Sequence, residues 1–130
     1  MRWSRVVFVF LLAYSFSYAN HISWLGEYDK ALSLAKEKRK PLMVLLVKKS
    51  CKKCNEVIER NFINHSYIDD MRQKYVSVII TYEGRCSYPI ELFYSNTFPT
   101  LFFVNSIDES FLFEPIYAKD IDIFLKHNFF

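Results

Sequence analysis

Cys51 and Cys54 form a C-x-x-C pair that follows an apolar run and opens an amphipathic stretch. Cysteines at this spacing at the start of a helix can close a small disulfide ring. They also lie at the positive end of the helix dipole, which favours thiolate over thiol. Lys52 and Lys53 act in the same direction, and the thiolate is the species that attacks disulfides. The spacing therefore predicts a redox-active dithiol.

A static disulfide and a metal site are the alternatives. The chain has no second C-x-x-C and no H-x₃₋₅-H pair to complete a zinc site. Its three histidines are scattered singly, at His21, His65 and His127. Copper(I) on the two sulfurs would need a further soft ligand, for which Cys86 and Met43 are the candidates. We expect no metal and no bound cofactor.

The N-terminus has the order of a secretory signal peptide. Residues 1–5 are cationic, residues 6–16 are uncharged and mostly apolar, and residues 17–19 place Ser and Ala at the −3 and −1 positions of a cleavage site. The apolar run is shorter than the roughly 20 residues of an ordinary membrane span. We therefore expect a cleaved signal peptide over residues 1–19, with an uncleaved anchor as the alternative.

Cleavage there would leave 111 residues, a single domain over residues 20–130 that can bury one modest core. Without the two arginines of the signal segment, 15 Lys and Arg face 14 Asp and Glu, so the mature charge is about +1. That balance gives no reason to expect nucleic-acid binding. Two glycines, Gly26 and Gly84, are too few for a glycine-rich phosphate loop.

Hydrophobic periodicity predicts the elements that position the dithiol. Helices are expected over residues 28–40, from Cys54 to a break at 61–65, over 66–75 and around 121–125. Strands are expected over residues 42–47, 75–82, 100–104 and 111–117, with an irregular segment at 83–96 that contains a helical turn around 90–93. The strand over 42–47 lacks polar alternation, so both of its faces should be covered, as in a parallel or mixed sheet between helices.

Further marks accompany the dithiol. Trp24 precedes an Ala-rich helix, residues 31–36, which leads to Lys40-Pro41. A second motif is Phe98-Pro99-Thr100-Leu101, in which Pro99 lies 45 positions after Cys54. With these marks and a C-x-x-C beside a βα pattern, the chain resembles the thioredoxin superfamily, in particular the small exported thioredoxin-like proteins. The resemblance implies an α/β thioredoxin fold with a central mixed sheet flanked by helices.

The resemblance also implies roles for the site residues. Cys51 would be the exposed nucleophile and Cys54 the buried resolving thiol. Pro99 would be cis, and the backbone of Phe98 would pair with an extended substrate. The Lys52-Lys53 dipeptide replaces the Gly-Pro of thioredoxins and would make the couple more oxidising. The effect should be modest, because both ammonium groups are expected to be solvated.

Besides the Lys52-Lys53 dipeptide, two positions depart from the family pattern. Ser50 replaces the Trp usual before the first cysteine, so the rim of the site should be more open. Leu45 occupies the position of the buried aspartate that thioredoxins carry six residues before that cysteine. Cys54 would then lack its usual proton acceptor unless Glu56, Glu59 or water substitutes.

Cys86, next to Arg85, is the cysteine left over. We expect a spare buried thiol, with a link to a partner or exchange with the active pair as alternatives. The function that we expect is an exported, monomeric thiol–disulfide oxidoreductase of the periplasm that acts on protein disulfides or dithiols and has a membrane redox partner. The alternative is a thioredoxin-like binding module that holds copper(I) or docks a partner without redox turnover.

Overall fold

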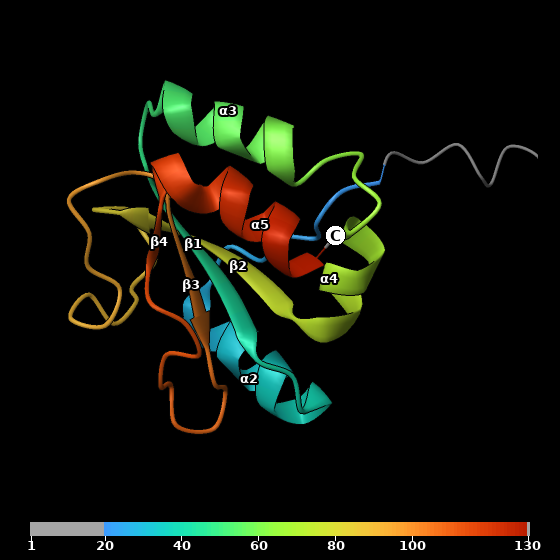
Figure 1. The fold of residues 1–130 in the computed structure, drawn as a ribbon. Coiled ribbons are helices and arrows are strands. Elements are labelled where there is room, and N and C mark those ends of the chain that lie inside the picture. Colours follow the sequence, from blue (N-terminus) through green and yellow to red (C-terminus); the bar gives the residue numbers. More distant parts are fainter. Residues whose placement is uncertain (1–19, 130) are drawn as a thin grey trace, which may run out of the picture.

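The computed structural model describes residues 20–129, so the signal segment expected at residues 1–19 lies outside the described part of the chain. A four-stranded sheet in the order β2-β1-β3-β4 lies at the centre (Figure 1). The strands are β1 (Leu42–Lys48), β2 (Val76–Tyr82), β3 (Thr100–Val104) and β4 (Ile116–Tyr117). The helices are α2 (Tyr28–Lys38), α3 (Lys52–Asn61), α4 (Ile68–Lys74), α5 (Ile121–Phe129) and the 3-10 helix η1 (Ala118–Asp120).

The sheet is mixed. Strand β1 pairs in parallel with β2 and antiparallel with β3, and β3 pairs antiparallel with β4. Helices α3 and α5 lie on one side of this sheet and α2 on the other (Figure 1). The expected α/β architecture, a central mixed sheet flanked by helices, is confirmed. Among residues 20–129, no helix is long and apolar enough to cross a membrane.

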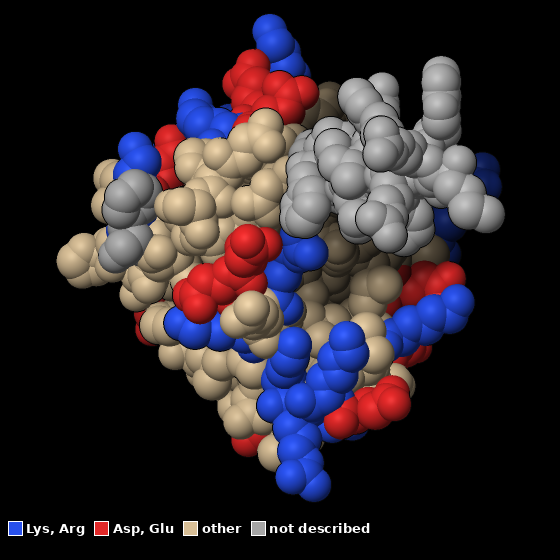
Figure 2. All heavy atoms as spheres, turned by 90° about the vertical axis from the view of Figure 1, so that its right-hand side faces the viewer, with Lys and Arg blue, Asp and Glu red and all other residues tan. Residues whose placement is uncertain are grey.

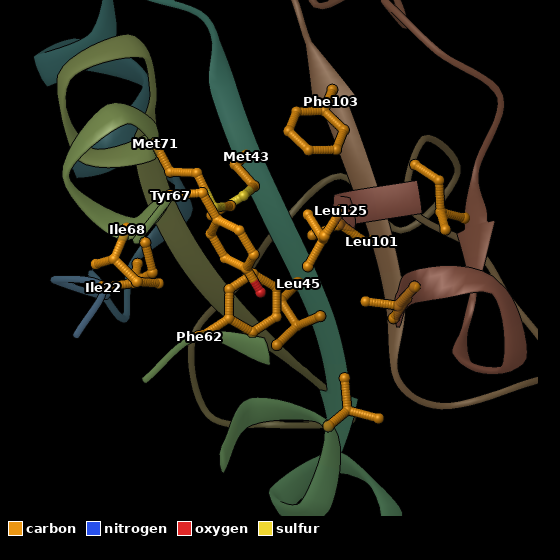
Figure 3. Close-up of a cluster of buried hydrophobic side chains, with 13 residues drawn as sticks. Ile22, Met43, Leu45, Phe62, Tyr67, Ile68, Met71, Leu101, Phe103 and Leu125 are labelled. Atoms are coloured by element: carbon orange, nitrogen blue, oxygen red, sulfur yellow. The ribbon is translucent and has the colours of Figure 1, made fainter. Parts of the chain in front are cut away.

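Successive residues of β1 contribute to two cores, one on each face of the sheet. The α3-side core, drawn in Figure 3, consists of Ile22, Met43, Leu45, Val57, Phe62, Tyr67, Ile68, Met71, Leu101, Phe103, Ile116, Ile121 and Leu125. The α2-side core consists of Tyr28, Ala31, Ala35, Leu42, Val44, Leu46, Val76, Val78, Ile80, Phe93, Phe102 and Val104. The β1 residues of both cores are at most 1% exposed, so the prediction of a strand covered on both faces is confirmed.

The expected break between the helices after the dithiol is also confirmed, because α3 ends at Asn61 and α4 begins at Ile68. The helical turn expected in the irregular segment is present too. The backbone N–H groups of Leu92 and Phe93 both donate to the carbonyl of Pro89, at 3.1 Å each.

The prediction of a strand over residues 111–117 is wrong in the length of the strand. Only Ile116 and Tyr117 form β4, while Phe111 makes a single bridge to Val104. Pro115 has no N–H to donate to a ladder, and the aromatic run before it lies on the surface, with Phe111 and Phe113 each 41% exposed. High β-propensity in this run is therefore not matched by a partner strand along its whole length.

Candidate active site

The dithiol lies where β1 ends and α3 begins. After Lys48 the chain turns through Lys49 and Ser50, which adopts a left-handed conformation with φ 54°. Cys51 is then the N-cap residue of α3 and is joined to Cys54 by a disulfide, with S–S 2.11 Å and Cα–Cα 5.2 Å. The first turn of the helix therefore holds both sulfurs, as the C-x-x-C spacing predicted.

The local electrostatics favour negative charge on the sulfur of Cys51. The backbone N–H of Cys54 donates to Cys51 Sγ at 3.1 Å, which gives this sulfur the contact that a capping oxygen makes at other helix starts. After reduction, the same N–H and the helix dipole would stabilise a Cys51 thiolate. Lys52 and Lys53 are exposed as expected, and Lys52 Nζ lies 4.0 Å from the carboxylate of Glu56 with both side chains in solvent.

The two sulfurs differ in burial in the expected order, because Cys51 is 9% exposed and Cys54 is 2% exposed. The expectation that Cys51 is openly exposed is nevertheless wrong for the disulfide form. The bond to Cys54 and the hydrogen bond from its N–H hold Cys51 Sγ against the start of the helix. Ser50 beside it is exposed.

Neither of the two candidate glutamates takes the place of the aspartate that this chain lacks at position 45. Leu45 is fully buried and shares the α3-side core with Val57, one helical turn after Cys54. Glu56 and Glu59 are exposed, and they lie two and five residues after Cys54, outside the i+3 and i+4 positions that share its helix face. Neither glutamate therefore lies in the core behind Cys54.

The peptide bond between Phe98 and Pro99 is cis, and Pro99 is buried at the start of β3. Hydrogen bonds hold the loop in front of it: Thr97 N–H donates to Ser95 Oγ at 3.1 Å, and Thr100 Oγ1 donates to Thr97 O at 2.7 Å. The Ser-x-Thr-x-x-Thr spacing of this network was visible in the sequence, but our sequence analysis missed it. The loop presents the backbone that the resemblance assigns to substrate.

Lys48 connects the end of β1 with this loop. Its Nζ lies 5.4 Å from the ring centroid of Phe98, and the ring of Tyr82 lies 5.5 Å from Phe98 on the neighbouring part of the sheet. Phe98 is half-buried and packs against the α2-side core. The structure therefore brings Lys48, which the sequence analysis did not single out, to one of the predicted substrate residues.

A groove of about 700 Å³ extends from the first turn of α3 to the cis-proline loop. It is lined by Lys53, Tyr94, Asn96, Thr97, Phe98, Tyr117, Ala118 and Lys119. Lys53 and Phe98, both predicted site residues, thus lie on one groove. Tyr117 and Lys119 were missed, because nothing in the local sequence links residues so far along the chain to the dithiol.

The two candidates for a further copper(I) ligand, Met43 and Cys86, lie elsewhere. Met43 is fully buried in the α3-side core, where Figure 3 shows it beside Met71. Cys86 lines a separate hollow of about 310 Å³ together with Lys49 and Arg85. Among residues 20–129, no three His, Cys, Asp or Glu side chains gather as a metal site. The structure therefore gives the copper(I) alternative no third ligand of these types.

The expectation of a buried Cys86 is wrong, because its thiol is free and exposed. Glu83, directly after β2, adopts φ 55° and turns the chain away from the sheet. Residues 83–87 then lie outside both cores, so the thiol has no apolar surroundings to enter.

The fold and the dithiol together define an α/β protein with a C-x-x-C at a helix start and a cis-proline before a central strand. The model of a family described as thioredoxin-like matches residues 23–106, and the chain belongs to this family. The resemblance to the thioredoxin superfamily is thereby confirmed. Comparison with curated proteins gives no match.

Two solved structures share the fold. A chain from the crystal structure of a ferredoxin:thioredoxin reductase and thioredoxin f2 complex is 15% identical, with a TM-score of 0.55, over 84% of this chain and 94% of that one. The DsbH oxidoreductase is 14% identical, also with a TM-score of 0.55, over 83% of this chain and 85% of that one. At such identities the likeness shows the thioredoxin fold alone.

Proposed function

We propose that this protein is an exported thiol–disulfide oxidoreductase that exchanges electrons with protein disulfides or dithiols through Cys51 and Cys54. One observation carries the proposal: the two sulfurs are bonded to each other at the N-terminus of α3, where Cys54 N–H donates to Cys51 Sγ. A helix start of this kind stabilises the thiolate that each exchange step needs. The groove beside it gives a polypeptide a place to lie.

The reaction uses only sulfur, protons and the two cysteines. In the reducing direction, the Cys51 thiolate attacks a substrate disulfide, forms a mixed disulfide and releases one substrate thiolate. Cys54 loses its proton and attacks the sulfur of Cys51, which releases the second thiolate and closes the Cys51–Cys54 disulfide. Two electrons pass from the dithiol to the substrate. The reverse sequence oxidises a substrate dithiol, and the reduction potentials of the two couples set the direction.

The location and the partners belong to the same proposal. The order of charges and apolar residues over residues 1–19 supports a cleaved signal peptide and a periplasmic location. A reductase in that compartment needs an electron donor, for which a membrane protein is the natural source. The two similar structures, a chain from a complex of a thioredoxin with a reductase, and an oxidoreductase, support protein partners in general. We propose that the domain acts as a monomer.

A trapping experiment tests the proposal. In a Cys86→Ser background, Cys54→Ser should accumulate mixed disulfides with proteins of the cell envelope, while Cys51→Ser should trap none. The Cys86→Ser protein with both active cysteines is the control and should release its partners. If Cys54→Ser traps nothing, or if Cys51→Ser traps equally well, the proposed function or the assigned roles are wrong.

Export has its own test. The full chain should be recovered from the periplasm with Asn20 as its first residue, which N-terminal sequencing would show. Recovery from the cytoplasm with Met1 in place would overturn the proposed location and leave the thiol chemistry to be judged by the trapping experiment.

A further inference from the structure

We propose that the site prefers polypeptides with an acidic residue next to the reacting cysteine. The proposal rests on the proposed function and narrows its substrate class. It assigns a specificity role to Lys53 and Lys119, which lie on the groove beside the dithiol. Its basis is the charge, the apolar surface and the lack of carboxylates in this groove.

The positive charge near the dithiol is local. Residues 20–129 carry 15 Lys and Arg against 14 Asp and Glu, so the domain as a whole is nearly neutral. Yet Lys48, Lys49, Lys52 and Lys53 flank Cys51 directly in the sequence, and all four are exposed. Lys119 adds a fifth ammonium group from η1, far away in the chain.

The groove itself contains no acid among its lining residues. No carboxylate of residues 20–129 lies within 4.0 Å of the ammonium groups of Lys53 or Lys119. Asp120, the neighbour of Lys119, lines a different hollow together with His127. The two lysines are therefore available to a carboxylate on a bound chain.

Several other basic residues of the molecule have local explanations. On the face shown in Figure 2, acidic side chains lie next to basic ones over much of the surface, and two ion pairs of α4, Lys74–Asp70 at 3.0 Å and Arg72–Asp69 at 3.7 Å, are of this type. A further basic run, residues 36–40, begins in the last turn of α2, where cations interact favourably with the helix dipole. Figure 1 places that helix on the other side of the sheet from α3.

Three aromatic residues line the same groove as the two lysines. Tyr94 is 64% exposed and Tyr117 is 44% exposed, and the half-buried ring of Phe98 lies between the loop and the sheet. Aromatic side chains with a free face bind apolar groups of a partner at low conformational cost. A chain that fits this groove has an apolar side chain near its cysteine and a carboxylate within reach of either lysine.

The alternative explanation is that the lysines only stabilise the Cys51 thiolate. Lys53 is open to that explanation because it lies between the two cysteines. Lys119 belongs to η1 and lines the groove without being a sequence neighbour of the cysteines, so it tests substrate selection with less effect on the thiolate. The experiment therefore compares two substrates on one enzyme, which cancels any change in the reactivity of Cys51.

The substrates are two short peptides with one cysteine each, activated as the neutral 2-pyridyl disulfide. They are identical except for Asp or Asn beside the cysteine. The protein and its lysine variants carry Cys86→Ser, because the exposed Cys86 thiol would also react. The Cys51 thiolate of the reduced protein attacks the peptide sulfur, forms the mixed disulfide and releases coloured pyridine-2-thione, whose absorbance gives the rate. We expect the Asp peptide to react about three to ten times faster than the Asn peptide at low ionic strength.

The preference should fall towards one at about 1 M salt, where charges are screened within roughly 3 Å. Lys119→Gln should lower the ratio of the two rates, and Lys119→Glu should lower it further or reverse it. Lys38→Gln, an exposed lysine of α2 outside the groove, is the matched control and should keep the wild-type ratio.

The uncharged pyridyl disulfide of 2-mercaptoethanol separates the two proposals. If the reduced protein does not react even with this probe, the proposed function itself fails. If it reacts with the probe but shows equal rates for the two peptides, only the substrate preference is overturned. A preference that Lys119→Gln leaves intact, or that salt does not weaken, overturns the assignment to the groove.

Discussion

The two faces of the sheet contribute different halves of the site. The α3-side core includes Val57 of α3, the helix that carries both sulfurs, and it is covered by α3, α4 and α5. The α2-side core is covered by one helix and by the irregular segment 83–99, and Phe98 packs against it. The position of the dithiol therefore depends on one core, and the position of the substrate loop depends on the other.

The two halves meet at the end of β1. Met43 and Leu45 of this strand point into one core and Val44 and Leu46 into the other, and Lys48 at the end of the strand lies over the ring of Phe98. A substitution in the α3-side core should therefore affect the reactivity of the sulfurs, and a substitution in the α2-side core should affect substrate binding. The predictions below use this separation.

The largest effect is expected from Leu45→Asp compared with Leu46→Asp. Both leucines are at most 1% exposed, so each variant loses apolar burial and buries a polar group, and each should lose about 5 kcal/mol of stability. Burial raises the pKa of the new carboxyl, so it can take a proton from a neighbouring thiol near neutral pH. Only position 45 faces the α3-side core, so only Leu45→Asp should speed the resolving step of Cys54.

Urea unfolding would give the stabilities, and the release of a peptide from a Cys51 mixed disulfide would give the resolving rate. The comparison needs conditions in which both variants remain folded. A resolving rate for Leu45→Asp that stays flat between about pH 6 and 9 would show that another base already serves Cys54. An equal gain in Leu46→Asp would show that the two faces do not act separately.

Phe93→Ala and Phe62→Ala should have similar effects on stability but different effects on binding. Each removes a nearly fully buried ring, Phe93 from the α2-side core and Phe62 from the α3-side core, and each should cost about 3–5 kcal/mol. Phe93 precedes the cis-proline loop and its ring lies 5.2 Å from that of Phe102. We expect Phe93→Ala to weaken peptide binding and to leave the reaction with a small disulfide largely unchanged.

Steady-state rates with a peptide disulfide and with a small disulfide, measured below the unfolding temperature of each variant, would check this pair. For Phe93→Ala, KM for the peptide should rise while the rate with the small disulfide stays within about twofold. A fall in both rates, or a rise in KM for Phe62→Ala alone, would mean that the α2-side core does not position the loop.

Each core also contains a buried tyrosine that responds to alkali. Burial, with a smaller effect from Asp122, raises the pKa of Tyr67 to about 12, and burial and a hydrogen bond to Glu109 raise the pKa of Tyr28. A phenol whose pKa is raised by folding contributes stability that is fully present below its unfolded pKa of about 10. For Tyr67 this contribution, about 2–3 kcal/mol, is lost as the pH rises from about 10 to 12, because the unfolded chain ionises first.

Unfolding free energies at about pH 8 and pH 11 would measure this loss. Tyr67→Phe and Tyr28→Phe should each flatten the decline, because neither phenylalanine can ionise. If alkali lowers stability equally in the wild type and in both variants, other groups cause the decline. A change in only one variant would show that one core opens first.

The sequence predicted the position of the two cysteines better than it predicted the residues that line the groove. Adjacent residues are enough for a dithiol at a helix start, and the unbroken apolar run of β1 predicted a strand covered on both faces. Tyr117 and Lys119 reach the groove only because β4 pairs with β3, a contact between distant parts of the chain. Local periodicity carries no information on such a contact.

The two wrong sequence predictions, for Cys86 and for the strand over residues 111–117, have a similar cause. Cys86 was expected inside because cysteine is usually buried, but the turn at Glu83 takes it out of the sheet. Residues 111–117 have the composition of a strand. However, the neighbouring strand β3 has only five residues, and only Ile116 and Tyr117 pair with it to form β4. Whether an apolar residue finds a partner depends on the rest of the chain.

The smallest predicted effect concerns charge at the sulfurs alone. Replacing Lys52 and Lys53 with Gly and Pro should disfavour the Cys51 thiolate and make the couple more reducing. Both ammonium groups are exposed, and Lys52 lies 4.0 Å from Glu56, so screening limits the shift to a few tens of millivolts, where about 30 mV corresponds to 1.4 kcal/mol. Equilibration with glutathione redox buffers would give the potential, with Lys38→Gln as the charge control far from the site. A potential that does not move, or that becomes more oxidising, would show that the start of α3 sets the thiolate without the lysines.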